Sequence, residues 1–204
     1  SAKGTVQIGS SNAAGLQSAQ AMGLRNEGSL ITLARYSPAI FAQSIGGGGG
    51  RIAQTSGGSV TIGSIDAAAS ADLSGGDIRI NNLGKVLSTK GDYSQALSAQ
   101  SIGGGGGWVG PVEGNLILGA QTSAAPMDGG DITVTNRAVI LTTGNTSPGI
   151  SLQSIGGDGA YTGQVDGTAQ FGSINSSGSQ NAGAIRLTNT GSIQTTGKFS
   201  PLIN

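Results

Sequence analysis

The sequence predicts an all-β fold, a parallel β-solenoid (β-helix) in which successive stretches of the chain stack along one axis. Three observations support this prediction. Short motifs recur with a period of about 53–57 residues, apolar residues alternate with polar ones over short stretches, and clusters of Asn, Gly, Ser and Asp separate those stretches. No stretch of a dozen residues has the apolar spacing of an amphipathic helix. We expect the coil to be right-handed.

The repeat is the strongest of these observations. Three motifs keep the same order along the chain: Q-S-I-G-G, a motif that begins with Asn, and an apolar-x-apolar-Gly motif. Independent motifs that share one order and nearly one period indicate a repeat architecture. The copies begin at Gln43, Gln100 and Gln153 for the first motif, at Asn26, Asn82, Asn136 and Asn189 for the second, and at Val6, Val60, Leu116 and Ala169 for the third.

Shorter spacings inside the repeat predict the size of each rung. Ile62, Arg79, Leu97 and Leu116 lie in strand-like pieces at nearly equal spacing along the chain. We therefore predict rungs of about 18 residues, three to each repeat. On this interpretation the repeated asparagines lie at turns, where Asn tolerates left-handed backbone, and they do not stack directly because they are three rungs apart.

We expect one continuous solenoid segment over residues 1–204. Its repeat copies run roughly over 1–56, 57–112 and 113–166, with a partial copy over 167–204. A single rung cannot bury its own inner face, so stability depends on contacts between neighbouring rungs. We expect the solenoid to continue beyond this segment.

Composition excludes several classes of function. The chain has no His and no Cys, which removes the usual zinc, haem and iron–sulfur ligands and the histidine-based triads. Its formal net charge is zero and the sequence shows no basic stripe, so we expect no nucleic-acid partner. No run of about 18 apolar residues occurs, so we expect no membrane-spanning helix. No signal peptide is visible at the first residues.

The glycine runs allow two interpretations. Gly46–Gly50 and Gly103–Gly107 are unbroken runs in a chain with 39 glycines. One interpretation is a corner at which backbone packs tightly against a neighbouring rung or sheet, and the other is an anion-binding nest of amides. A phosphate loop needs Lys and then Ser or Thr after the glycines, whereas Arg51-Ile52 follows the first run here. The packing interpretation is favoured.

The acidic residues do not form a recognisable catalytic or metal-binding motif. The best match to a calcium-binding β-roll, Gly156–Tyr161, has Tyr161 where the Asp ligand belongs. Asp77 and Asp131 occupy equivalent repeat positions, which favours turn residues over a catalytic dyad. We expect no catalytic residues, no cofactor and no metal. A cleft assembled from distant rungs remains open as an alternative.

Trp108 is the candidate for contact with a partner. It follows a glycine run, outside the predicted repeat core, and an exposed Trp can act as a binding hot spot. Tyr36 and Tyr93 occupy equivalent positions before a serine, so we expect them to serve packing.

The repeat resembles a known family. The stretches Gly76–Gly107 and Gly130–Gly159 follow a pattern of G-D-I-x-V-x-N followed by Q-S-I-G-G-G-G-G, which looks like the repeats of large autotransporter passengers of Gram-negative bacteria. The resemblance covers essentially the whole chain. It implies a long β-helical stalk exported through a C-terminal outer-membrane barrel, which would lie outside this segment, and commonly an adhesin. It supplies a scaffold and no functional residue.

These observations predict a structural or adhesive role and no enzymatic one. The leading hypothesis is the stalk of an adhesin at the bacterial cell surface, which supports cell attachment or biofilm formation through repeated weak contacts. Its partners would be host, neighbouring-cell or matrix molecules, or copies of itself. An alternative is a segment of a self-assembling extracellular fibre, since open strand edges template pairing. A polysaccharide-degrading β-helical enzyme is the third and weakest hypothesis.

Overall fold

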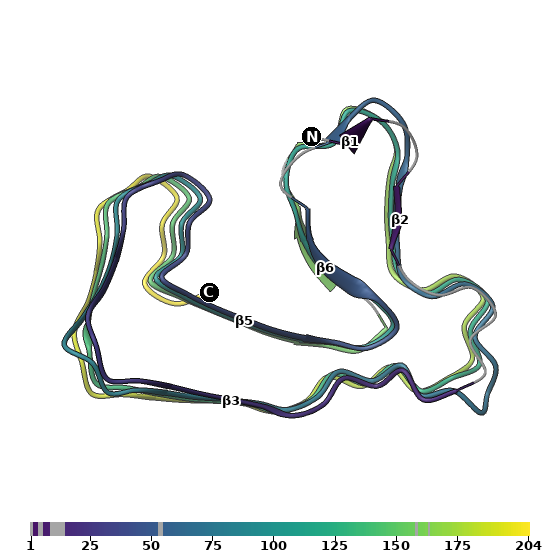
Figure 1. Cartoon of the computed structure of the whole chain (residues 1–204), viewed down its shortest axis with the longest axis horizontal. Helices are drawn as coiled ribbons and strands as arrows, with labels where there is room; N and C mark the ends of the chain where they lie inside the picture. The colour runs from purple at the N-terminus through teal and green to yellow at the C-terminus, as the bar shows by residue number, and fades with distance from the viewer. Residues whose placement is uncertain (1, 4–5, 9–14, 53–54, 158, 163) are drawn as a thin grey trace.

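The computed structural model describes residues 2–3, 6–8, 15–52, 55–157, 159–162 and 164–204. Over these residues the chain forms twenty strands, and every strand pair is parallel. Figure 1, viewed down the short axis, shows successive copies of the repeat lying over one another. The fold is therefore all-β with parallel sheets, as expected for a β-solenoid. The described part of the chain contains no helix that is long and apolar enough to cross a membrane.

Six sheets run along the stack, and each takes its strands from successive repeats. The first sheet contains β3 (Met22–Asn26), β9 (Ile78–Asn82), β14 (Ile132–Asn136) and β19 (Ile185–Asn189). The second contains β4 (Leu30–Thr32), β10 (Val86–Thr89), β15 (Val139–Thr142) and β20 (Ile193–Thr195). The third contains β5 (Ile40–Ile45), β11 (Leu97–Ile102) and β16 (Ile150–Ile155).

The other three sheets are shorter or have shorter strands. One contains β6 (Gly49–Ile52), β12 (Gly106–Val109) and β17 (Gly159–Thr162). Another contains β2 (Val6–Ile8), β8 (Val60–Ile62), β13 (Leu116–Leu118) and β18 (Ala169–Phe171). The last pairs β1 (Ala2–Lys3) with β7 (Thr55–Ser56).

The strand register corrects the predicted rung size. Leu97 pairs with Ile40 on one side and with Ile150 on the other, so paired residues are a full repeat apart. The strands at the shorter spacing, such as those of Ile62 and Arg79, belong to different sheets of the same coil. The prediction of three rungs to each repeat is therefore wrong. One coil contains the whole repeat, because its sides face in different directions and cannot pair with one another.

The coil has three lobes in cross-section (Figure 1). The strand lobe is formed by the sheets of β3, β4 and β5, at the left of the view. The narrow lobe is formed by the sheets of β6 and β2, and the loop lobe by residues 64–74 and 120–128. Each lobe has its own cluster of buried apolar side chains. A coil that divides in this way needs backbone segments to meet closely where the lobes join.

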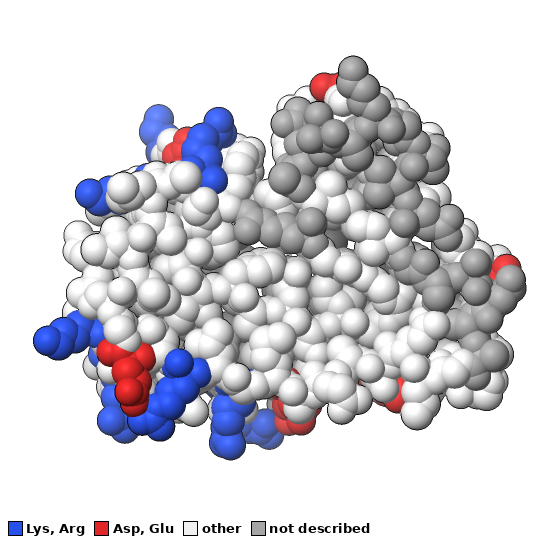
Figure 2. All heavy atoms as spheres, viewed as in Figure 1, with Lys and Arg blue, Asp and Glu red and all other residues white. Residues whose placement is uncertain are grey.

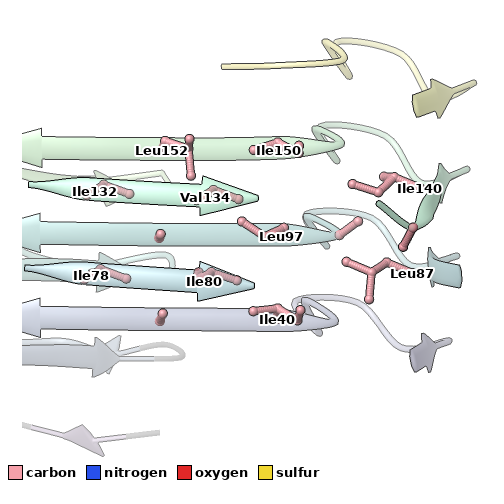
Figure 3. Close-up of a cluster of buried hydrophobic side chains, with 14 residues drawn as sticks. Ile40, Ile78, Ile80, Leu87, Leu97, Ile132, Val134, Ile140, Ile150 and Leu152 are labelled. Carbon is pink, nitrogen blue, oxygen red and sulfur yellow. The ribbon is translucent and has the colours of Figure 1, made fainter. Parts of the chain in front are cut away.

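The core of the strand lobe is built from stacked aliphatic rows. Figure 3 shows Ile78 and Ile132 in one row, on strands of the first sheet, and Leu87 and Ile140 in another, on strands of the second sheet. These four side chains are at most 1% exposed. Burial of each contributes on the order of 1.5–3 kcal/mol. Because equivalent positions carry similar side chains, the register that pairs the strands also stacks the core.

The repeated asparagines form a continuous ladder, contrary to the sequence-based expectation. Asn26 Nδ2 donates to Asn82 Oδ1 at 2.8 Å, Asn82 Nδ2 to Asn136 Oδ1 at 2.6 Å, and Asn136 Nδ2 to Asn189 Oδ1 at 2.7 Å. Each asparagine ends a strand, and none has a positive φ. They stack directly because a single coil, and not three rungs, separates them.

Asn136→Ala should destabilise the fold by about 2–4 kcal/mol. The side chain of Asn136 is fully buried, and its loss removes the acceptor of the buried Asn82 amide and the donor to Asn189. Thr135→Ala, on the neighbouring half-buried residue, is the matched control and should cost clearly less. Urea denaturation of both variants measures the difference, and equal losses would contradict a stabilising role for the ladder.

Among the described residues other than glycine, left-handed backbone occurs at two turn positions. Asp66, Thr122 and Asn175 share one of them, with φ of 52–54°. The second occurs between the second and third sheets and has φ of 51–56° in its four copies, Tyr36, Tyr93, Thr146 and Phe199. A β-branched residue is disfavoured in this region, whereas Asn tolerates it. Thr122 is therefore strained relative to Asn175 at the equivalent position.

Thr122→Asn should stabilise the protein by about 0.5–1 kcal/mol, since it relieves this strain at an exposed position. Thr133→Asn is the control, because Thr133 lies in the extended strand β14, where Asn is disfavoured. Thermal unfolding should show a higher Tm for the first variant and an unchanged or lower Tm for the second. A lower Tm for Thr122→Asn would show that the threonine is not strained.

Candidate functional site

The Q-S-I-G-G motif lies where the three lobes meet. Its Gln, Ser and Ile residues end β5, β11 and β16, and its glycines form the corner that follows. On one face of this sheet the glutamines form a second ladder. Gln43 Nε2 donates to Gln100 Oε1 at 2.6 Å, and Gln100 Nε2 donates to Gln153 Oε1 at 2.6 Å. The amide of each motif therefore binds the next coil.

On the opposite face, the serines join this sheet to the segment before the first sheet. Ser101 Oγ donates to the carbonyl of Gly76 and accepts from the N–H of Gly130, both at 2.8 Å. Ser154 Oγ makes the same two bonds one coil further on, to Gly130 and Gly183. Each hydroxyl thus bridges two neighbouring coils. Ser101 is fully buried, so its loss would leave a donor and an acceptor unpaired inside the protein.

The first glycine of each run lies against backbone of the loop lobe. A β-carbon on Gly46 would overlap the carbonyl oxygen of Leu73, and one on Gly103 would overlap that of Met127. The amide of the following glycine donates to the equivalent loop-lobe residue of the preceding coil: Gly104 N–H bonds Leu73 O at 2.9 Å, and Gly157 N–H bonds Met127 O at 2.8 Å. These contacts support the packing interpretation of the runs.

The same contacts contradict the anion-nest interpretation for the amides concerned. Gly103 N–H donates to Ile155 O at 2.9 Å, and Gly106 N–H donates to Gly48 O at 3.3 Å. An anion needs several amides of one loop free and aimed at one point. Here Gly103, Gly104 and Gly106 already bind carbonyl groups within the protein.

The run also contacts the strand of the apolar-x-apolar-Gly motif. Ser64 Oγ donates to Gly47 O, and Ser173 Oγ donates to Gly157 O, both at 2.5 Å. A β-carbon on Gly105 would overlap the α-carbon of Gly63. Two motifs that are separate in the sequence thus meet at one junction. The glycines that end both motifs indicate in the sequence that backbone packs closely at each of them. The sequence does not indicate that the two motifs pack against each other.

Trp108 lies in a cluster of aromatic rings between two lobes. It belongs to β12 of the narrow lobe, and its ring meets Tyr36 of the strand lobe edge-on, with centroids 5.5 Å apart. Tyr36 stacks on Tyr93 at 5.0 Å, and the Arg35 guanidinium lies 5.4 Å and 5.6 Å from their two ring centroids. The packing expected for the two tyrosines is present.

Trp108 is only 3% exposed, which corrects its expected place outside the repeat core. A buried ring is not available as an exposed contact for a partner. Its aromatic packing joins the strand lobe to the narrow lobe, an arrangement that edge-to-face aromatic pairs stabilise by about 0.5–1.5 kcal/mol beyond burial. The partner-contact prediction for Trp108 therefore has no support in its position.

The acidic residues at equivalent turns bind backbone of the next coil. Asp77 Oδ1 accepts from the N–H of Asp131 at 2.8 Å, and Asp131 Oδ1 accepts from the N–H of Ala184 at 2.7 Å. Two interactions hold the pKa of Asp131 below its ordinary value. The larger is the hydrogen bond from the Ala184 N–H, and the second is the contact of Arg186 Nη1 with Asp131 Oδ2 at 3.1 Å. The ionised carboxylate therefore stabilises the fold above its ordinary pKa, and this contribution is lost as the pH falls through the lowered pKa.

A cavity of about 220 Å³ opens beside these carboxylates. It is lined by Ala21, Met22, Asp77, Ile78, Arg79, Asp131 and Thr133. Two of the lining residues, Arg79 and Thr133, are paired neighbours on adjacent strands of the first sheet.

Among the described residues, no three His, Cys, Asp or Glu side chains lie close enough together to hold a metal ion. The calcium interpretation of Gly156–Tyr161 involves Asp158, which lies outside the described residues. Comparisons of the chain with protein families, with characterised proteins and with solved structures find no match.

Proposed function

We propose that this chain is a structural segment of an extracellular β-solenoid, the stalk of a surface-displayed adhesin of the autotransporter type. One observation carries the proposal: the residues that define the repeat bind neighbouring coils. The Asn, Gln and Ser of the motifs form ladders between coils, and the glycines allow backbone to pass at the lobe junction. Repetition of the sequence therefore serves continuation of the stack.

The dimensions of the coil favour a rigid, broad stalk over a thin spacer. Neighbouring parallel strands lie about 4.8 Å apart, so each coil, although it contains a whole repeat, adds only that length to the stack. Such a stack displays a wide lateral surface for its length. We expect the coil to be right-handed, as crossovers between parallel strands of one sheet nearly always are.

Labelling of intact cells tests the proposal. Antibodies raised against the chain should label unpermeabilised cells of its source, and added protease should remove the label. Labelling that appears only after permeabilisation would contradict an extracellular role. The same antibodies should detect a polypeptide much larger than the 19.8 kDa of this segment. A band of about this mass, recovered from filaments, would indicate a polymerising fibre subunit instead.

A further inference from the structure

The coil collects basic residues that are scattered along the sequence. All eight Lys and Arg residues whose side chains the structure describes lie on the strand lobe. Figure 2 shows basic groups at the tip, the corner and the outer side of this lobe. Each of them is exposed, and they are Arg25, Arg35, Arg79, Lys85, Lys90, Arg137, Arg186 and Lys198.

Five of these eight bases have no ion pair among the described residues. Arg25 pairs with Glu27, Arg35 with Asp92 at 3.9 Å, and Arg186 with Asp131 at 3.1 Å. The five bases outside these pairs are Arg79, Lys85, Lys90, Arg137 and Lys198. Their positive charge is therefore available to a partner.

The acidic residues do not follow the same distribution. Four of them, Glu27, Asp77, Asp92 and Asp131, lie on the strand lobe, which leaves its eight bases in excess. The other described acids lie on the remaining lobes: Asp66, Asp72 and Asp128 on the loop lobe, and Glu113 and Asp166 on the narrow lobe. Over the described side chains, a chain of zero net charge thus has an excess of positive charge on its strand lobe. Such a local field attracts anionic partners even when the whole molecule is neutral.

The shape of this surface fits a flexible linear polyanion. Lys85 follows β9 and Arg137 follows β14, so both lie at the corner between the first and second sheets. Their strands belong to adjacent coils, and such strands are spaced by about 4.8 Å. Arg79 and Arg186 lie on the outer side of the first sheet, and Lys90 and Lys198 lie at the tip after β10 and β20. A flat bilayer could contact one of these three sides at a time, whereas a flexible polymer can follow the lobe around its edge.

We propose that the strand lobe binds an acidic extracellular polysaccharide through this basic surface. The identification of the polymer as extracellular rests on the proposed function. Carboxylate or sulfate groups along the polymer would bind Arg79, Lys85 and Arg137 as charge-assisted pairs. Because these bases lie on neighbouring coils of one lobe, several weak contacts act together on one polymer chain.

Binding of polygalacturonate, a uronic acid polymer, to the immobilised chain tests the proposal, with neutral dextran as the blank. We expect saturable binding that weakens as salt is added, and a loss of at least about tenfold in affinity for Arg79→Gln/Lys85→Gln/Arg137→Gln. These three side chains are exposed, so circular dichroism should show an unchanged fold.

A variant with restored net charge distinguishes the effect of the basic surface on binding from the effect of the overall charge. Adding Asp66→Asn, Glu113→Gln and Asp166→Asn to the triple variant returns the formal net charge to zero without restoring the basic surface. Binding should remain weak, and recovery would overturn the proposal. Absence of wild-type binding, or tighter binding of duplex DNA or of anionic phosphatidylglycerol vesicles, would also overturn it. Labelling of intact cells does not depend on polymer binding, so it tests the proposed function separately from this proposal.

Discussion

Deletion of residues 132–184 should leave a folded protein, whereas deletion of residues 132–149 should destroy the fold beyond Asp131. The first deletion removes one coil and joins Asp131 to Ile185, which takes the place of Ile132 beside Ile78. The ladders and the stacked core then continue in register. The shortened protein should unfold cooperatively, at a lower temperature, because it has lost one set of contacts between coils.

The second deletion removes a stretch of the length first predicted for a rung and joins Asp131 to Ile150. It deletes β14 and β15, which belong to the first and second sheets, so that every later strand reaches the wrong sheet. Limited proteolysis followed by mass spectrometry should show residues 150–204 cleaved rapidly in this variant and protected in the whole-coil deletion. If the protein with the 132–149 deletion stays folded beyond Asp131, rungs of about 18 residues would be supported, and pairing of strands a full repeat apart would be contradicted.

Gly103→Ala should destabilise the protein by more than about 3 kcal/mol or prevent its folding. The added methyl group would overlap the carbonyl oxygen and carbon of Met127, and both are backbone atoms that cannot move aside cheaply. The neighbouring bond from Gly104 N–H to Leu73 O would be strained by the same shift. The loss should therefore greatly exceed that expected for an ordinary Gly→Ala change.

Gly23→Ala is the matched control. Gly23 lies in strand β3, and a β-carbon there would meet no atom within 4 Å. This substitution should change stability by less than about 1 kcal/mol, in the stabilising direction, because Ala loses less conformational entropy on folding. Guanidinium denaturation measures both variants. If Gly103→Ala does not fold, Gly156→Ala in the next copy provides a third measurement, and tolerance of both would contradict a packing role for the runs.

The local part of the fold was predictable because it depends on near neighbours in the chain. Alternation at Ile78 and Ile80 predicted a strand, and the structure contains β9 at that place. The period of the motifs predicted which residues are equivalent, and Val60 indeed pairs with Leu116. The glycine runs were correctly expected to allow close packing. Each of these inferences needs only backbone preferences and periodicity.

The long-range part was not predictable, because it depends on which segments meet. The shorter spacing within the repeat was interpreted as a rung, since sequence alone does not show that the strands of Ile62 and Arg79 face different directions. The asparagines stack because one coil contains a whole repeat. The prediction of shorter rungs therefore also led to the wrong expectation that they do not stack. Trp108 was expected to be exposed because its partner Tyr36 lies far from it in the sequence.

Sequence patterning alone was enough to establish that this protein is built from short strands in repeating units, since side-chain alternation and turn residues act over a few positions. The folded coil was needed to show that one turn of the stack takes a whole repeat and that the eight basic side chains the structure describes gather on the strand lobe. Strand pairing and charge proximity depend on distances in space, which the order of residues along the chain does not give. Arg79, in β9, and Arg137, directly after β14, come to the same sheet only when the coil closes between them.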